Sequence, residues 1–346
     1  MESVAIFKSL VTLETIKLKN KESFVNLLKG WRGEFEFYKL ANEQGVKFVE
    51  GPWVLRAGYE PVRILLYFHS ENIDSFPKQL MDIKSAYLRP FILTFSILDE
   101  TVPYPPPWYV QSTGIWRIST KRPLLPSVRY EIYNQNFDYI GTVDYNNQQI
   151  LEKPPFEFRT GKQPRFSKYD DKYVNEVTST EGEALGTEFL KTLYAKRFFI
   201  NYLASRFSLV ETGDLDAILL YKGNKFIVEI KEKFPIPETN EFGWDAHRMI
   251  PYFLFTKEMN AKVLYCIREV VSENNRAFKD WKIIDLDKFL LYANYAAAIA
   301  GSAGALGLGQ RTTTLQVPVN EFYSLSQKSL KDTLNIILDK SNSNSE

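Results

Sequence analysis

The chain has very little cysteine and no long hydrophobic run. Its 346 residues include a single cysteine, Cys266, which lies in an apolar stretch. This excludes a disulfide framework and cysteine-based zinc binding, and it is compatible with a reducing environment. The start MESVAIFKSL has no basic stretch followed by a long apolar run. Since no window approaches the roughly 18 apolar residues of a membrane span either, we expect a cytoplasmic protein without a membrane partner.

Net charge is nearly absent as well. The 43 Lys and Arg residues offset 42 Asp and Glu residues, which leaves a formal charge of +1. Such a chain has no bulk attraction to nucleic acid, and this disfavours a histone-like coating role. A protein that reads a DNA sequence or shape needs only a local basic cleft. The candidates are residues 117–129 and 159–172, two loops interrupted by proline.

The length favours two domains, because single hydrophobic cores stop growing near about 250–300 residues. Residues 1–150 predict an α+β domain with one helix at 24–41, and we expect this domain to recognise DNA. Its β-like runs are 5–18, 46–55, 62–69, 91–98, 115–120, 128–133 and 139–145. Residues 151–180 are poor in aliphatic side chains and predict a linker. Residues 181–300 form the expected α/β catalytic core, and 301–346 form a C-terminal extension with a polar tail.

One segment of this expected core predicts a β-hairpin. The β-rich runs 217–221 and 226–230 flank Gly223-Asn224, a pair that tolerates the positive φ angles of tight turns. The second run is almost continuously apolar, which is typical of a strand buried on both faces. Ionisable residues at the end of such a strand are costly unless they have a function.

The hairpin register predicts a cluster of three ionisable side chains. With a two-residue turn, Asp216 lies opposite Lys231, and facing residues point to the same side of the sheet. Glu229 shares that side because it is two positions from Lys231. A four-residue turn preserves this parity, whereas an odd-length turn or a bulge does not.

The predicted cluster suits metal-dependent phosphodiester hydrolysis. Two carboxylates on a rigid sheet are typical ligands for Mg²⁺, which takes one or two protein carboxylates and keeps several waters. Such a cation activates a water, orients the phosphate and offsets the charge that develops on its oxygens. Lys231 would steer or activate the water. We expect Mg²⁺ as the cofactor, with Mn²⁺ as a substitute.

These residues resemble the PD-(D/E)xK nuclease superfamily, which includes type II restriction endonucleases and Holliday junction resolvases. The likeness rests on Asp216, thirteen positions before Glu229, and on Glu229-Ile230-Lys231 in the next strand, and it covers about residues 181–270. The spacing is most similar to the resolvase and Mrr-like branch. Leu215 stands where the family pattern has proline. The resemblance implies a mixed αββαβ core in which Asp216 and Glu229 bind Mg²⁺ and Lys231 assists the water.

The family also implies a further glutamate from the preceding helix, which we place at residues 182–206. Glu181, Glu183 and Glu188 lie near its start. Glu188 is the preferred candidate because it adjoins the apolar face, and Glu183 is the second. Acidic residues are also common at helix N-termini for electrostatic reasons alone. Asp214 is a rival to Asp216 for the metal if the first strand extends backwards.

After the hairpin, residues 244–258 predict a helix and 261–267 a third strand. His247 and Arg248 lie near the start of this helix, where they could meet a phosphate or simply flank a buried Trp244. In the N-terminal domain, substrate contacts would come from aromatic and basic side chains. The candidates there are Trp108, Trp116 and Arg117.

The sequence therefore predicts a Mg²⁺-dependent DNA endonuclease, most similar to a type II restriction enzyme, because a separate domain of about 150 residues is large enough to read a sequence. Three alternatives remain open: a structure-specific nuclease of the resolvase or repair type, a DNA-binding protein that no longer cleaves, and an interaction module in which the hairpin is only structural. The partner is double-stranded DNA, and a homodimer would match the symmetry of a palindrome.

Overall fold

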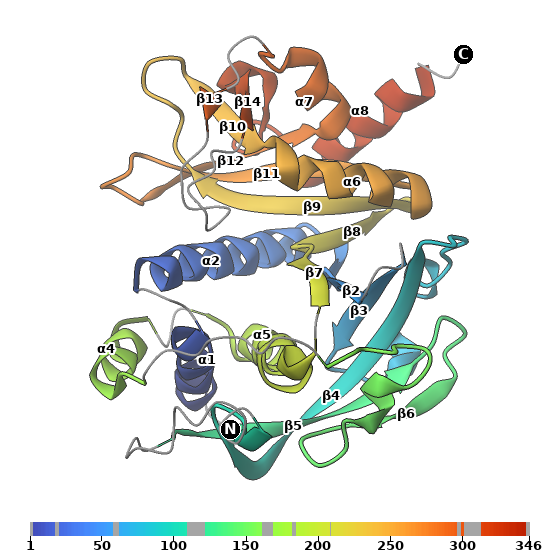
Figure 1. The fold of residues 1–346 in the computed structure, drawn as a ribbon. Coiled ribbons are helices and arrows are strands. Elements are labelled where there is room, and N and C mark those ends of the chain that lie inside the picture. The colour runs from blue at the N-terminus through green and yellow to red at the C-terminus, as the bar shows by residue number, and fades with distance from the viewer. Residues whose placement is uncertain are drawn as a thin grey trace. The chain divides into compact units, whose positions relative to one another are not determined.

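The computed structural model describes residues 3–17, 21–57, 62–108, 122–160, 169–181, 185–207, 209–295, 299–300 and 313–343. The chain divides into two compact units (Figure 1). Unit 1 contains residues 1–28 and 52–214, and unit 2 contains residues 29–51 and 215–346. The expected boundaries near 150, 180 and 300 do not coincide with this division. Residues 52–214 of unit 1 are therefore inserted between the two segments of unit 2.

Unit 1 combines a mixed β-sheet with helices. Its six-stranded sheet has the order β6-β5-β4-β3-β2-β7, in which β3 and β4 are parallel and the other pairs antiparallel. The strands are β2 (Trp53–Ala57), β3 (Arg63–His69), β4 (Leu88–Pro103), β5 (Leu124–Tyr133), β6 (Tyr139–Val143) and β7 (Leu209–Asp214). The helices are α1 (Ser3–Lys17), α4 (Asp171–Glu181) and α5 (Thr187–Phe198), with the short helices η1 (Ile73–Ser75), η2 (Lys78–Leu80), η4 (Gln149–Glu152), η5 (Phe199–Leu203) and η6 (Ala204–Arg206).

Two expectations for unit 1 are wrong. Residues 5–18, expected as a β-like run, form most of α1. This helix packs against α4 and α5, and side chains on several of its sides are buried, so its sequence lacks the polar stripe of a surface helix. The expected linker at 151–180 contains α4 and lies within unit 1 rather than between units.

Unit 2 has a second mixed sheet. Its six strands have the order β1-β8-β9-β11-β12-β15, and β10, β14 and β13 form a smaller sheet. The strands are β1 (Lys47–Glu50), β8 (Ala217–Tyr221), β9 (Asn224–Lys233), β10 (Glu241–Asp245), β11 (Ala261–Val270), β12 (Phe278–Asp285), β13 (Ile299–Ala300), β14 (Thr313–Pro318) and β15 (Tyr323–Ser324). The helices are α2 (Lys21–Glu43, from residue 29 onwards), α6 (Ala246–Glu258), α7 (Leu286–Tyr292), α8 (Leu330–Ser343) and the short η7 (Val319–Glu321).

Helices cover both faces of the unit 2 sheet around β9 and β11, which are parallel neighbours. On one face α2 packs on the strands, and Phe37 meets Trp281 with ring centroids 5.3 Å apart. On the other face Trp244 stacks on Tyr265 at 4.4 Å beneath α6. Figure 1 shows α2 and α6 on opposite sides of β9. The result is an α+β protein built on mixed sheets.

Several expected elements of unit 2 are present with shifted ends. The predicted helix 244–258 begins at Ala246, because Trp244 belongs to β10. The third strand is longer than the predicted 261–267 and ends at Val270. In the part of the chain that the structure describes, no helix combines the length and apolarity that crossing a bilayer requires.

Candidate active site

The β8–β9 hairpin has the predicted parity but a different register. Its two turn residues are Lys222 and Gly223, with φ angles of 48° and 76°, rather than Gly223 and Asn224. Ala217 therefore pairs with Val228, two positions from the expected alignment. One step further along this register, Asp216 lies across from Glu229 and not from Lys231. The slip keeps all side chains on their predicted faces because the strand period is two.

Hydrogen bonds hold Asp216 in place near the point in the chain where unit 2 resumes, at Leu215. Its carboxylate Oδ2 accepts a hydrogen bond of 2.5 Å from the main-chain N–H of Ile230. Its carbonyl oxygen accepts a hydrogen bond from the Tyr38 hydroxyl of α2. Gly51 also donates its N–H to this carbonyl at 3.2 Å. These contacts fix the backbone and one carboxylate oxygen of Asp216 before any ligand binds.

Lys231 joins the two carboxylates. Its Nζ lies 2.7 Å from Glu229 Oε1 and 3.6 Å from Asp216 Oδ2. Burial by itself would lower the pKa of Lys231, but Asp216 and Glu229 outweigh burial and raise this pKa above its ordinary value. Lys231 therefore remains a cation at physiological pH.

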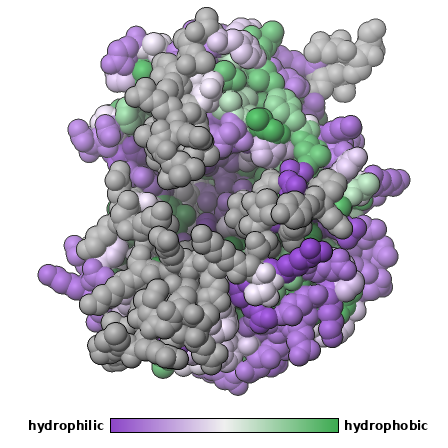
Figure 2. All heavy atoms as spheres, in the orientation of Figure 1, coloured by the Kyte–Doolittle hydropathy of each residue, from purple (hydrophilic) through white to green (hydrophobic). Residues whose placement is uncertain are grey.

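Helix α6 completes the surroundings of Glu229. The buried Tyr252 hydroxyl donates a hydrogen bond to Glu229 Oε2. Arg248 lies in the first turn of α6, and its Nη1 is 3.8 Å from Glu229 Oε1. The outward side of the same helix is apolar, where Ile250 and Phe253 are exposed, and Figure 2 shows hydrophobic residues gathered on this part of the surface. Thus α6 supplies one tyrosine and one arginine to the cluster.

The cluster is open on its cationic side. The side chains of Asp216 and Glu229 are only 9% and 5% exposed. Those of Lys231 and Arg248 are 29% and 49% exposed. An anionic ligand from solvent would therefore meet the two cations first, with the carboxylates behind them.

Lys233 continues this row of side chains along β9, and the sequence reasoning missed it. Its ammonium donates to the carbonyl oxygen of Gly243 and lies 5.8 Å from the centroid of the Tyr265 ring. Burial lowers the pKa of Lys233 to about 8, against the opposing charge of Asp245. The alternation Glu229, Lys231, Lys233 was the signal that could have identified it.

On the opposite face, Arg268 forms a separate ion-pair network. Its Nη2 lies 3.0 Å from Oε1 of Glu36, a residue of α2. Its Nη1 lies 2.9 Å from Oε2 of Glu232, a residue of β9. Glu232 also accepts two hydrogen bonds from Arg276. Since Glu232 and Glu229 differ by an odd number of positions, these charges lie on the other side of the sheet. They link α2 to the sheet and do not contact the cluster.

The expected fourth acidic residue lies elsewhere. Glu188 belongs to α5 in unit 1, where its side chain is 71% exposed and pairs with Lys191 at 2.6 Å. The helix expected to accompany the hairpin thus contributes to unit 1, and α2 covers the unit 2 sheet instead. Asp214 also belongs to unit 1, where its carboxylate lies 3.3 Å from Arg197. Glu183 lies outside the described residues.

The residues expected to contact DNA are likewise divided between unit 2, unit 1 and the part of the chain that is not described. Arg248 lies in the cluster, and the half-buried His247 precedes it on α6. Trp108 is half-buried in unit 1 and is not part of the cluster. Trp116 and Arg117 lie outside the described residues.

The donor set of the cluster fits a hard divalent cation. Within the described ranges no group of three or more His, Cys, Asp or Glu side chains converges, so a site made only of protein ligands is absent there. Mg²⁺ needs only one or two carboxylates when waters and substrate oxygens complete its shell. Asp216 and Glu229 meet that requirement, because each carboxylate oxygen has two lone pairs and their hydrogen bonds leave acceptor capacity.

Comparison with known proteins does not extend this picture, since neither a protein-family model nor a curated protein matches the chain.

Proposed function

We propose that the chain is a Mg²⁺-dependent DNA endonuclease whose active site contains Asp216, Glu229, Lys231 and Arg248. The observation that carries this proposal is the contact of one lysine ammonium with two buried carboxylates from neighbouring strands. Buried carboxylates are expensive unless they are paired or functional, and this pair has an exposed cationic side that a phosphate can approach.

The order of elements in unit 2 supports assignment to the PD-(D/E)xK superfamily. Unit 2 runs through α2, β1, β8, β9, β10, α6 and β11, which contains the αββαβ order with β1 and β10 as additional strands. The three residues of the motif follow the order that the resemblance implies, with Asp216 before β8 and Glu229 and Lys231 within β9. The helix comes from the start of the chain rather than from residues 182–206.

In this proposal Asp216 and Glu229 hold Mg²⁺. When bound, the cation supplies a Lewis acid that activates a water and offsets charge on the phosphate oxygens. The hydrogen bond from Ile230 to Asp216 keeps one carboxylate in place, and the hydrogen bond from Tyr252 does the same for the other. Rigid ligands avoid reorganisation during the reaction, which is the basis of electrostatic preorganisation.

Lys231 would supply positive charge to the scissile phosphate, and Arg248 to the phosphate next to it. Because the raised pKa of Lys231 keeps its ammonium protonated, this residue acts as a hydrogen-bond donor that steers the attacking water or binds a phosphate oxygen. Arg248 is exposed enough to bind the adjacent phosphate through its guanidinium fork.

Sequence-specific cleavage of the restriction type is the form that we favour, with unit 1 as the reading domain. Residues 52–214 form most of a compact unit of their own, as a separate recognition domain requires. Cutting both strands of a palindrome needs two symmetric active sites, which a homodimer would supply.

The direct test is incubation of the full chain with supercoiled plasmid in Mg²⁺, in Mn²⁺ and in EDTA. We expect discrete bands with either metal and intact plasmid in EDTA. An Asp216→Asn protein purified identically controls for contaminating nucleases. A smear would indicate cleavage without sequence reading, and cutting of branched substrates alone would indicate a resolvase-type enzyme. Absence of cleavage in both metals on plasmid, mixed genomic and branched DNA would contradict the proposal.

Tyr252→Phe is expected to weaken metal binding without unfolding the protein. The change removes the hydroxyl that holds Glu229 Oε2 and keeps the buried ring. Residues that orient a metal ligand typically change metal affinity or activity by about 10–100-fold when altered. The Mg²⁺ concentration for half-maximal cleavage should therefore rise about tenfold, and Mn²⁺ affinity measured by calorimetry should fall in parallel.

Tyr265→Phe is the matched control for this prediction. Tyr265 is also a buried tyrosine on the same face, but its hydroxyl donates to the carbonyl of Gly243 at 2.8 Å instead of to a carboxylate. Its removal should leave the metal requirement unchanged. Equal metal-binding behaviour of the two variants would show that Tyr252 has only a packing role.

A further inference from the structure

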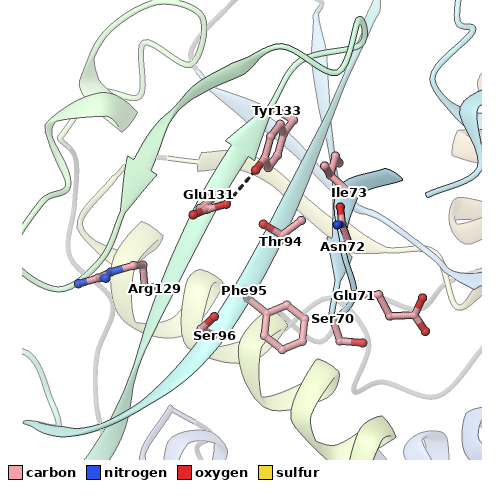
Figure 3. Close-up of a pocket in the computed structure, with 10 residues that line it drawn as sticks. All are labelled: Ser70, Glu71, Asn72, Ile73, Thr94, Phe95, Ser96, Arg129, Glu131 and Tyr133. Atoms are coloured by element: carbon pink, nitrogen blue, oxygen red, sulfur yellow. Dashed lines mark hydrogen bonds between the residues drawn. The ribbon is translucent and has the colours of Figure 1, made fainter. Parts of the chain in front are cut away.

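Unit 1 has a polar hollow of about 460 Å³ on the face of its sheet that the helices leave open (Figure 3). Small-molecule sites are typically about 300–1,000 Å³, so the hollow can hold one planar heterocycle. None of the proposed catalytic residues lines it. It therefore needs an explanation of its own.

Strands β4 and β5 form the floor of the hollow. Thr94 pairs with Glu131, and Ser96 with Arg129, so these four side chains share one face of the sheet. The other face is core, where the buried Tyr130 donates its hydroxyl to the carbonyl of Ala195 in α5. The polar residues of the floor are therefore a surface feature of a well-packed sheet.

The segment after β3 forms a fixed wall. Asn72 accepts hydrogen bonds at its carbonyl from the N–H and hydroxyl of Ser75, at 2.9 Å and 2.8 Å. His69 Nε2 lies 2.7 Å from the same hydroxyl. The Asn72 side chain accepts from the N–H of Asp74 through Oδ1, at 3.1 Å. Figure 3 shows this segment facing Thr94 across the hollow. The wall is thus ordered without a ligand.

The charge of the lining disfavours phosphate. Glu71 and Glu131 both line the hollow. Arg129, the one basic residue among the described residues of the lining, has its Nε 3.6 Å from Asp144 Oδ2, so its charge is partly balanced. An uncharged or cationic group with N–H donors fits this lining better than an anion does.

The hydrogen-bonding groups of the lining indicate the ligand class. Tyr133 donates to Glu131 Oε2 at 2.8 Å and holds that carboxylate, while no hydrogen bond from the described residues reaches Oε1. Asn72 uses Oδ1 in its own turn, so Nδ2 is the group of this lining residue that can donate to a ligand. The hollow therefore offers an acceptor at Glu131 and a donor at Asn72, with Thr94 between them (Figure 3).

We infer that the hollow binds a single nucleobase whose exocyclic amino group adjoins an unprotonated ring nitrogen on the Watson–Crick edge, cytosine or adenine. The amino group would donate to Glu131, and this ring nitrogen would accept from Asn72. Glutamate is a known acceptor for the cytosine amino group, and asparagine pairs with adenine. Thymine presents a carbonyl oxygen to the carboxylate instead and is rejected.

The idea that this site reads DNA rests on the proposed function of the chain. A DNA base can enter such a hollow only from a single strand or after rotating out of the duplex. The same chemistry would also accept a free nucleoside. The two sources differ in whether a polynucleotide chain contributes to binding.

The test is fluorescence anisotropy of the full chain in EDTA with single-stranded dodecamers of cytosine, adenine or thymine. We expect cytosine or adenine to bind about tenfold more tightly than thymine, the discrimination of one well-placed pair of hydrogen bonds. Glu131→Gln should abolish this preference, because an amide also donates to the thymine oxygen. Glu100→Gln, the same change on β4 outside the lining, should preserve it.

Competition by cytidine, adenosine, thymidine and spermidine distinguishes the occupants. Displacement by cytidine or adenosine at concentrations similar to those of the bases in the dodecamers would identify a free-nucleoside site. Equal affinity for the three dodecamers, a preference that survives Glu131→Gln, or displacement by spermidine alone would overturn the inference. A Glu131-dependent preference in a protein that does not cleave DNA would keep the base site and reject the nuclease.

Discussion

An Asp216→Asn variant is expected to bind duplex DNA as well as the unmodified protein and to cleave it at least about 10³-fold more slowly. The amide keeps the size of the side chain and still accepts the 2.5 Å hydrogen bond from Ile230. It removes the negative charge that would hold the proposed cation. Glu229→Gln should have the same effect, since the other carboxylate alone is a poor site. Metal ligands serve the transition state more than the ground state, so cleavage is lost while DNA binding persists.

Asp214→Asn is the matched control, two positions earlier in the chain. Its carboxylate pairs with Arg197 in unit 1 and does not contact Lys231. Cleavage by this variant should stay within about threefold of the unmodified rate, because the change alters only a partly exposed ion pair in unit 1. The measurement is single-turnover cleavage of a labelled duplex at saturating Mg²⁺. Undiminished cleavage by Asp216→Asn, or its loss only in Asp214→Asn, would refute the assignment of the metal ligands.

Lys231→Met is expected to slow cleavage by about 10²–10³-fold or more at every Mg²⁺ concentration. Methionine keeps most of the aliphatic stem but removes the ammonium that contacts both carboxylates. Without that cation, the two carboxylates should bind divalent metal at least as tightly, because they lose a competing positive charge. Calorimetry with Mn²⁺ should therefore show unchanged or tighter binding together with slower cleavage.

Slower cleavage together with unchanged or tighter metal binding would distinguish a catalytic lysine from a structural one. Lys222→Met provides the control, because Lys222 lies in the turn of the same hairpin, where its ammonium binds Asn335 at 2.7 Å. That variant should retain both metal affinity and rate. If Lys231→Met lost metal binding along with cleavage, Lys231 would be needed to assemble the site rather than to act on the substrate.

The hairpin illustrates what local sequence can and cannot predict. The two strands and their faces follow from alternating and continuous apolar runs, and both are observed. The turn was placed one residue too late, since Lys222 adopts a positive φ angle that lysine rarely takes. The cluster survived this error because a slip of two residues changes partners but not faces.

The helix beside the hairpin shows the opposite case. Proximity in sequence suggested that α5 would bring Glu188 to the cluster, but its buried residues, including Leu190 and Leu193, pack within unit 1. Tyr38 of α2 instead contacts Asp216 across 178 positions of the chain. Helical periodicity gives the face that a helix buries and contains no information about which sheet receives it.

The sequence by itself determined the local order of strands, the parity of Asp216, Glu229 and Lys231, and the lack of a disulfide framework, because each follows from residue type or from spacing along one segment. Only the tertiary structure decided that residues 52–214 of unit 1 are inserted between the two segments of unit 2, that Asp214 and Asp216 belong to different units, and that Tyr252 and Arg248 reach Glu229. These features depend on which apolar surfaces bury one another across long stretches of chain. Packing of that kind is set by the complementarity of whole faces, which no single segment encodes.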